Sequence, residues 1–336
     1  MSVGEDQKER LRRAKLAALA RDALGVLGEP ETAGRLTALI SDGTAVTFVE
    51  QGDAATLAGS LVWAQRRGAT RLVLLADQGA PLLTRLAGHF ALGGSDVEVR
   101  EVRGVDLVEV EPEPVGPVQA PPAGAEHLVQ ELHDAGVEVV VEPGVVRGEV
   151  AGLEVARLVE WPTEVGGDGE LHLEVGIGRF DRDATAAARP DEPPSESLAR
   201  AVSMVTERRR ADGGAHPIQR LSRERWLRRT VLDDPSLVGA AELAPAQMTV
   251  EPVGLKDPHP AAAVGTDLQG DPLVVVCSAG VDLALVPLAA DARALHAPGA
   301  RLVLAAPARD HHPATRTLVE LLREPGELVD VRPEWG

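Results

Sequence analysis

The sequence has a single cysteine, Cys277, no tyrosine, and an aromatic content of only 2% over its 336 residues. One cysteine cannot form an intrachain disulfide, and it excludes a zinc site built from several cysteines. This cysteine usage favours a reducing compartment. With so few aromatic residues, the core has to be built mainly from Val, Leu and Ala, and the apolar share of 44% is large enough to fill one.

Long apolar runs are also missing. No uncharged apolar segment reaches the roughly 20 residues that a helix needs to span a bilayer. The N-terminal region is rich in charge and has no apolar segment of the kind that signal peptides contain. We therefore expect a cytoplasmic protein that does not insert into a membrane.

The charge balance is strongly acidic, with a formal net charge of −18. An acidic chain repels phosphate backbones in general, which excludes a protein that coats nucleic acid without specificity. A local basic patch could still bind an anion.

The N-terminal part alternates strands and helices after a first helix over residues 5–27. The expected strands are residues 45–50, 71–76 and 97–102, and the expected helices between them are residues 53–67 and 80–92. Short apolar strands that alternate with helices of this length indicate parallel pairing with right-handed crossovers.

The same order of elements returns near the C-terminus. Strands are expected over residues 273–277, 301–305 and 328–332, with helices over residues 281–296 and 313–324. Residues 68–74 (GATRLVL) and 299–304 (GARLVL) also match in detail. This agreement fits either an internal repeat or the topology that any two βαβαβ units share.

The centre of the chain has a different pattern. Strands at residues 137–142, 153–160 and 170–176, joined by Gly-rich turns, indicate an antiparallel meander. Two arginine-rich helices are expected at residues 198–211 and 217–232. The fold class is therefore α/β, with two similar βαβαβ (Rossmann-like, parallel-sheet) units flanking a central α+β segment. The expected parts are 1–110 (N-terminal helix and βαβαβ unit), 111–123 (Pro-rich linker), 124–241 (central α+β segment), 242–271 (weakly structured Pro-rich connection) and 272–336 (C-terminal βαβαβ unit).

The first candidate site follows the last central strand, where two glycines precede alternating arginine and aspartate. Glycine lets a backbone approach a ligand, arginines could clamp a phosphate or carboxylate, and aspartates could hold a hydrated divalent metal. The residues are Gly176, Gly178, Arg179, Asp181, Arg182 and Asp183. The alternative is a surface turn whose charges pair with each other.

The second candidate is the region between residues 200 and 230, which holds nine arginines and only three acidic residues. Arg220 and Arg223 fall on one helical row, and we assign both to anion binding. The alternative is that these arginines pack against the acidic remainder of the same chain.

The third candidate is a set of carboxylates on the central strands. Glu154 and Glu174, with Asp181 and Asp183, are the candidate catalytic residues, and the two aspartates are the candidate metal ligands. Over about 65 residues this segment resembles the PD-(D/E)xK nuclease core in outline, which implies carboxylates around a metal that activates water. The pattern departs from that family because no lysine follows an acid at the required spacing. The alternative is ordinary exposed glutamates on a meander.

Two smaller features fit structural roles better than chemistry. Cys277 ends an apolar strand and is expected in the core. The adjacent His311 and His312 precede Pro313, and we expect them in an exposed loop rather than at a metal.

Three segments, at residues 176–183 (GIGRFDRD), 223–228 (RERWLR) and 255–258 (LKDP), resemble a group of uncharacterised proteins from high-GC, actinobacterial-type bacteria. The resemblance runs through most of the chain. It implies no activity, so it supplies no mechanism.

The leading hypothesis is an intracellular protein that binds a phosphate-bearing small ligand or a nucleic-acid end. No cofactor is evident, and a divalent metal would convert binding into phosphoester hydrolysis. The alternative is a noncatalytic interaction or scaffold protein, able to form a homo-oligomer, whose arginine-rich face pairs with its own acids or with a partner subunit. The sequence leaves open whether the protein is an enzyme.

Overall fold

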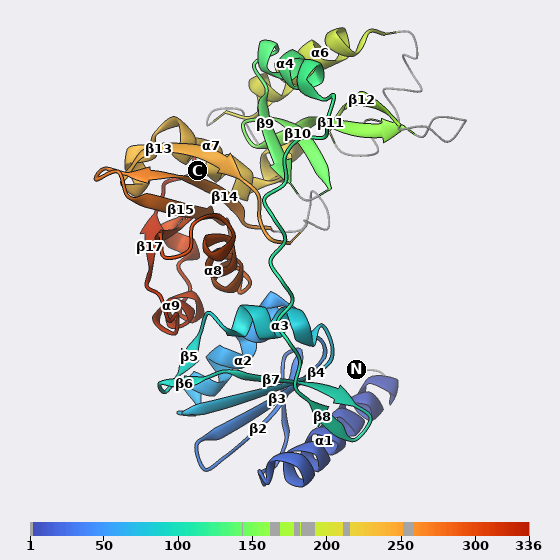
Figure 1. Ribbon diagram of the computed structural model, residues 1–336, viewed down its shortest axis with the longest axis vertical. Helices are drawn as coiled ribbons and strands as arrows, with labels where there is room; N and C mark the ends of the chain where they lie inside the picture. Colours follow the sequence, from blue (N-terminus) through green and yellow to red (C-terminus); the bar gives the residue numbers. More distant parts are fainter. Residues whose placement is uncertain are drawn as a thin grey trace. The chain divides into compact units, whose positions relative to one another are not determined.

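The structure is a computed structural model (Figure 1), which describes residues 3–142, 144–161, 169–177, 182, 192–210, 216–250 and 259–335. These residues form eight α-helices and sheets that mix parallel and antiparallel strands, so the protein is a mixed α/β protein. The chain divides into two compact units, each assembled from separate segments. Unit 1 comprises Met1–Val115, Val281–Asp291 and His311–Glu327, and unit 2 comprises Gly116–Gly280, Ala292–Asp310 and Leu328–Gly336.

Unit 1 contains a six-stranded sheet with the order β1-β2-β3-β4-β7-β8. Its strands are β1 (Glu31–Ala33), β2 (Leu36–Ser41), β3 (Thr44–Gln51), β4 (Arg71–Gln78), β7 (Glu98–Arg103) and β8 (Asp106–Val108). The three central strands β3, β4 and β7 are parallel, as their sequence pattern predicts, and the flanking pairs are antiparallel. The antiparallel β2–β3 hairpin is not among the expected elements, although its Asp42-Gly43 turn is a strong hairpin signal.

Helices cover both faces of this sheet. Helix α1 (Val3–Leu24) buries Leu16 and Leu19 against Val46 and Phe48 of β3. The crossover helices are α2 (Ala54–Arg66) and α3 (Ala80–Ala87). On the other face of β3, the hydroxyl of Thr47 donates a 3.0 Å hydrogen bond to Ser60 of α2. Successive residues of a strand point to opposite faces, which explains why one strand supports both layers.

The sequence places the start of α2 correctly. Asp53 is its N-cap, and its carboxylate accepts a 2.7 Å hydrogen bond from the backbone N–H of Thr56. The Thr56 hydroxyl accepts in turn from the Asp53 N–H, which completes a capping box.

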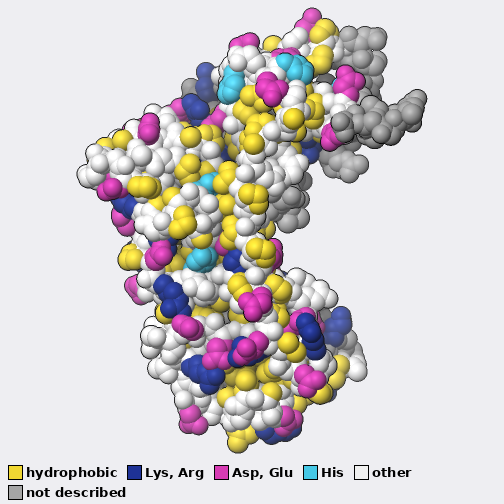
Figure 2. Space-filling view, viewed as in Figure 1, with side chains coloured by type: hydrophobic (Ala, Val, Ile, Leu, Met, Phe, Trp, Pro, Cys, Tyr) yellow, Lys and Arg dark blue, Asp and Glu magenta, His cyan; other side chains and the backbone are white. Residues whose placement is uncertain are grey.

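Charges on the surface of unit 1 are largely paired. Arg71 lies 2.7 Å from Glu98, and Arg103 lies 2.6 Å from Glu101. Figure 2 shows acidic and basic side chains side by side over the part of unit 1 where Figure 1 draws β7. Such exposed pairs add little stability, but they leave few isolated cations on this surface.

The late segments of the chain complete unit 1. They include the first turns of α8 (Leu285–His296) and all of α9 (Pro313–Glu320), beside the short hairpin of β5 (Ala91–Leu92) and β6 (Ser95–Asp96). The backbone N–H of Ala91 donates to the carbonyl of Leu321 at 3.0 Å, and Arg85 of α3 lies 3.2 Å from the buried Asp291 of α8. Helix α9 therefore belongs to the same compact unit as the N-terminal sheet.

Unit 2 contains two sheets. The first is an antiparallel meander with the order β12-β11-β10-β9. Its strands are β9 (Glu138–Glu142), β10 (Val145–Val150), β11 (Leu153–Trp161) and β12 (Glu170–Val175). Helices α4 (Glu126–Asp134) and α6 (Pro194–Arg208) bury Leu132 and Leu198 against it.

The second sheet has the order β13-β14-β15-β16-β17, in which β15 and β16 are parallel and β13, β14 and β15 are antiparallel neighbours. Its strands are β13 (Ala240–Ala246), β14 (Ala261–Asp267), β15 (Pro272–Cys277), β16 (Arg301–Ala306) and β17 (Gly326–Asp330). Helix α7 (Arg223–Asp233) packs Leu227 and Val231 onto this sheet.

Two predictions of local structure are wrong. Within residues 242–271, expected to be weakly structured, lie most of β13 and all of β14; β13 is an edge strand, where Pro245 is tolerated. The helix expected over residues 217–232 is interrupted. A 3-10 turn over Pro217–Arg220 precedes α7, and between them Ser222 has a positive φ of 43°.

Among the described residues, no helix combines the length and the apolar character needed to cross a bilayer.

Candidate functional site

A set of charged residues in unit 2 forms a buried network rather than an open site. Its acidic members stand on the meander, where Glu149 of β10 is paired in register with Glu154 of β11. Glu149 is 1% exposed and Glu154 is fully buried. Two neighbouring carboxylates in such a place require cations close by, because isolated buried charges are strongly unfavourable.

Glu154, a predicted catalytic residue, is surrounded by arginines. Its Oε1 accepts hydrogen bonds from Arg157 Nη2 and from Arg182 Nη1, both at 2.7 Å. Its Oε2 lies 3.1 Å from Arg147 Nη1. A carboxylate whose oxygens are held by three guanidinium groups is poorly placed to bind a metal.

Glu149 is held in the same way by α7. Arg225 Nη1 lies 2.7 Å from Glu149 Oε1, and Arg228 Nη2 lies 2.7 Å from Glu149 Oε2. Burial pushes the pKa of Glu149 upward, but the charges of Arg228, Arg225 and Arg147 outweigh it and hold this pKa below its ordinary value. Glu149 is therefore ionised at neutral pH and anchors α7 to the meander.

Arg225 extends the network to Glu142 of β9. Its Nη2 donates to both carboxylate oxygens of Glu142, at 2.9 and 2.8 Å. Arg147 also lies 3.1 Å from Glu142, and burial, which outweighs the charge of Glu142, lowers the pKa of Arg147. The guanidinium groups of Arg147, Arg225 and Arg228 are thus paired with carboxylates inside the protein.

The predicted site after β12 can be followed only in part. Arg182, assigned to ligand binding, is 7% exposed and pairs with Glu154. Glu174 lies 3.5 Å from Arg182 Nε. Gly178, Arg179, Asp181 and Asp183 lie outside the described residues. The structure brings Glu154, Glu174 and Arg182 together as an ion-pair cluster.

Gly176, also assigned to ligand binding, allows the chain to pack closely on Arg182. Its φ is +144°, and a Cβ at this position would lie 2.9 Å from the backbone nitrogen of Arg182. Its own N–H donates a 2.8 Å hydrogen bond to the carbonyl of Val155. The glycine is needed here because the backbone of residue 182 comes so close.

Metal ligands are not assembled in the part of the chain that the structure covers. Among the described residues, no group of three or more His, Cys, Asp or Glu side chains could hold a metal ion. Cys277 is buried in β15, as expected, and burial raises its pKa to about 12.

A stack of two arginines and two tryptophans links α7 to the end of the chain. The guanidinium carbon of Arg209 lies 4.6 Å from the ring centroid of Trp226, and that of Arg223 lies 5.6 Å from Trp335. The two rings are 5.2 Å apart. Arg209 is 3% exposed, and burial lowers its pKa to about 9. These contacts hold Arg209 inside the protein and stack the half-buried Arg223 on Trp335.

Three arginines remain at the surface where α6, the 3-10 turn and α7 meet. Gln219 links these segments by hydrogen bonds. Its side-chain N–H groups donate to the backbone carbonyls of Arg208 and Arg210, and its backbone carbonyl accepts from Arg223 Nε at 3.1 Å. Arg208 and Arg220 are exposed, and neither side chain pairs with any described residue. We call Arg208, Arg220 and Arg223 the basic face.

Comparisons of the chain with protein-family models, with curated proteins and with solved structures returned no match. The resemblance to the bacterial group and to the nuclease core therefore stays a prediction. Function has to be inferred from the geometry of the chain itself.

Proposed function

We propose that the protein binds a phosphate-bearing anion through the basic face. The observation that carries this proposal is that Arg208, Arg220 and Arg223 make no ion pair with a described carboxylate, in a chain of net charge −18. Acids are abundant, and Arg182, Arg225 and Arg228 all have acidic partners. Cations left unpaired in such a protein are available to an external anion.

A nucleic-acid backbone or nucleic-acid end fits the basic face better than a compact anion. Arginine presents a planar fork of N–H donors that matches phosphate oxygens. Arg208 and Arg220 are exposed and Arg223 is half-buried, so the side chains can offer donors to more than one phosphate. Arg179 remains a proposed ligand-binding residue, whereas Arg182 is no longer proposed as one because its guanidinium group is paired with Glu154.

A catalytic form of this proposal requires a divalent metal at Asp181 or Asp183. A metal there would supply an activated water for phosphoester hydrolysis. Glu154 would contribute little to such a step because it is committed to arginines.

The alternative function is a noncatalytic interaction or scaffold protein. It is favoured by the internal pairing of the arginine-rich region, in which Arg225 and Arg228 bind Glu142 and Glu149. In this function the basic face would contact the acids of a partner subunit. A stable oligomer in light scattering, together with no nucleic-acid binding at low salt, would favour it.

The proposed function is tested by fluorescence anisotropy with labelled single- and double-stranded oligonucleotides across a salt series. We expect binding that weakens steeply with salt. The Arg220→Ala protein should bind more weakly, with the salt slope for single strands shallower by about 0.7 for each phosphate that the protein no longer neutralises. Arg316→Ala, which removes an exposed arginine of α9 in unit 1, serves as the control and should bind normally.

Equal binding by wild type and Arg220→Ala would contradict the assignment of the basic face. Manganese-dependent shortening of the oligonucleotide would support the hydrolytic form, and intact oligonucleotide with and without manganese would oppose it.

We also propose that the two strand–helix alternations are Rossmann-like units related by an internal repeat, in a cytoplasmic protein. Support comes from their shared order of elements, from the parallel strands β3, β4 and β7, and from the parallel pair β15 and β16.

A further inference from the structure

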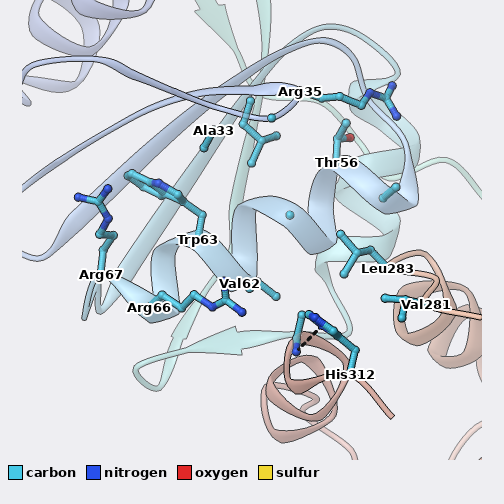
Figure 3. Close-up of a pocket in the computed structure, with 15 residues that line it drawn as sticks. Ala33, Arg35, Thr56, Val62, Trp63, Arg66, Arg67, Val281, Leu283 and His312 are labelled. Atoms are coloured by element: carbon cyan, nitrogen blue, oxygen red, sulfur yellow. Dashed lines mark hydrogen bonds between the residues drawn. The ribbon is translucent and has the colours of Figure 1, made fainter. Parts of the chain in front are cut away.

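A cavity of about 620 Å³ opens in unit 1 beside α2 (Figure 3). Its walls are mainly apolar and come from α2, from the β1–β2 hairpin and from the late segments of the unit. Leu36, Val62, Leu283 and Ala314 are among the residues that line it. This volume lies within the range of roughly 300–1,000 Å³ that small-molecule sites occupy.

One cation on this cavity is left without a partner among the described residues. Arg66 stands in the last turn of α2, and its side chain contacts no described acid. Its neighbours are occupied, because Arg67 pairs with Glu31, and Arg35 lies 3.1 Å from Asp53. Figure 3 shows Arg66 extending toward His312.

His312 adds a second donor beside Arg66. It is the N-cap of α9, and its Nδ1 accepts a 3.1 Å hydrogen bond from the N–H of Ala314. Because Nδ1 accepts, a neutral His312 carries its proton on Nε2, which has no hydrogen-bond partner among the described residues. The ring can therefore donate to a ligand.

No described residue that lines the cavity is acidic. The lining thus combines apolar walls with an unpaired guanidinium and an imidazole N–H. Arg66 and His312 are both exposed to solvent. An acid would gain an ion pair with Arg66 that an uncharged apolar ligand could not make. Two carboxylate oxygens match the donors of one guanidinium and one imidazole, and a single negative charge matches the single unpaired cation.

We propose that this cavity binds a small monocarboxylic acid with an apolar body. The apolar part fills the space along α2, and the carboxylate pairs with Arg66 and accepts from His312 Nε2. This site lies in unit 1 and uses none of the residues of the basic face, so it stands or falls independently of the function proposed above.

The test is isothermal titration calorimetry of the full chain with decanoate, decanol and acetate as probes. We expect decanoate to bind and acetate not to bind. Decanol should bind at least about tenfold more weakly than decanoate, because a hydrogen bond to a charged group contributes about 1.5–3 kcal/mol. Equal affinity for decanoate and decanol, or no heat with decanoate, would overturn the proposal.

Two variants test the charged end of the site. Arg66→Ala should reduce decanoate affinity by about tenfold or more, because it removes a charge-assisted pair. His312→Asn keeps a side chain that can cap α9 but loses the imidazole donor, and it should cost about two- to tenfold. Arg332→Ala, at an exposed arginine in unit 2 that has no described partner, is the matched control and should bind as wild type. Unchanged affinity in Arg66→Ala would overturn the proposal.

A third variant tests the apolar end without touching a charge. Gly59 lines the cavity on α2, and a Cβ there would lie 3.4 Å from the nearest atom of Leu36, which is ordinary contact. Gly59→Leu should therefore fold, with improved helix propensity, and should fill the space. We expect it to abolish decanoate binding, and wild-type affinity in this variant would place the ligand elsewhere and overturn the assignment.

Trp63 supplies an optical readout at the same place, since it lines the cavity. Decanoate should change the tryptophan fluorescence of the wild type, and Trp63→Phe should lose most of that change. A full response in Trp63→Phe would show that the acid binds away from α2.

Discussion

Arg228 and Glu149 form an ion pair that is closed to solvent, with Arg228 Nη2 2.7 Å from Glu149 Oε2, although they stand 79 positions apart in the chain. The pair joins α7 to strand β10, and Arg225 binds the second oxygen of the same carboxylate. Removing two charges from water is costly, so such a cluster selects one arrangement of these elements more than it adds stability.

Loss of the shared carboxylate should be severely destabilising. Glu149→Gln leaves the buried Arg228 without its anion and leaves Arg225 with Glu142 alone. Breaking a buried ion pair by removing one partner costs about 3–5 kcal/mol. Urea unfolding at pH 7 measures the change. Glu242→Gln, at an exposed position of β13, should stay within about 0.5 kcal/mol of wild type. Similar midpoints for the two variants would show that Glu149 is not the anchor of α7.

The contribution of Glu149 should also depend on pH. Its arginine partners hold its pKa below the ordinary value of 4.5, so the folded state binds fewer protons than the unfolded state in this range. The stability that it provides is complete above pH 4.5 and is lost as the pH falls through the lowered pKa. The difference in unfolding free energy between wild type and Glu149→Gln should therefore shrink on acidification, and a difference that grows would contradict this sign.

Removing both partners should cost less than the two single losses added together. In Arg228→Met, Glu149 keeps its ion pair with Arg225 and loses the one with Arg228. In the double variant with Glu149→Gln, both charges of the Arg228–Glu149 pair are absent, so neither is left without its partner. We expect a coupling of about 1–3 kcal/mol in a double-mutant cycle measured by urea unfolding. Additive effects would mean that the two side chains act independently.

The hairpin between β10 and β11 should tolerate no side chain at Gly152. Gly152 has a φ of +69°, and a Cβ there would lie 2.2 Å from the carbonyl carbon of Arg225. Gly152→Ala should therefore displace α7 as well as strain the turn, at a cost above the roughly 1–3 kcal/mol of backbone strain alone. Gly136→Ala isolates the strain, because Gly136 has a φ of +72° with open space around it. Thermal unfolding of the two variants compares them, and equal losses would exclude a clash with α7.

Cys277 should report on unfolding. It is fully buried, and burial raises its pKa to about 12, so almost no thiolate exists at pH 8 in the folded protein. A chromogenic disulfide reagent should react very slowly with the native protein and rapidly in denaturant. Fast labelling without denaturant would show that β15 opens readily.

The sequence predicts the parallel strands β3 and β4 of unit 1 because their buried runs are mainly apolar. It does not predict β10, whose Arg147 and Glu149 belong to the ion-pair network. The same limit applies to α7, because its sequence pattern gives no sign that Arg228 is fully buried. The partner that permits this burial is remote in the sequence, and local periodicity cannot detect it.

The ligand sites show the same division. Arg220 and Arg223 remain in the proposed basic face. Arg182 instead pairs with Glu154 inside the protein. The fold brings these two residues together, so the sequence alone does not indicate the pair. The sequence does not mark Arg66 as a ligand-binding residue, since a basic residue in the last turn of a helix is common. That no described acid pairs with it can be recognised only in three dimensions.

Unit 1 is assembled from three segments, and two of them, Val281–Asp291 and His311–Glu327, are synthesised long after the strands of its sheet. Val281, Leu283, His312 and Ala314 of these segments line the cavity beside α2. A ribosome-bound chain could form the N-terminal sheet early, but it could not enclose this cavity until both late segments had been translated. Binding of an acid in the cavity would therefore distinguish molecules that have acquired these segments from nascent or truncated ones.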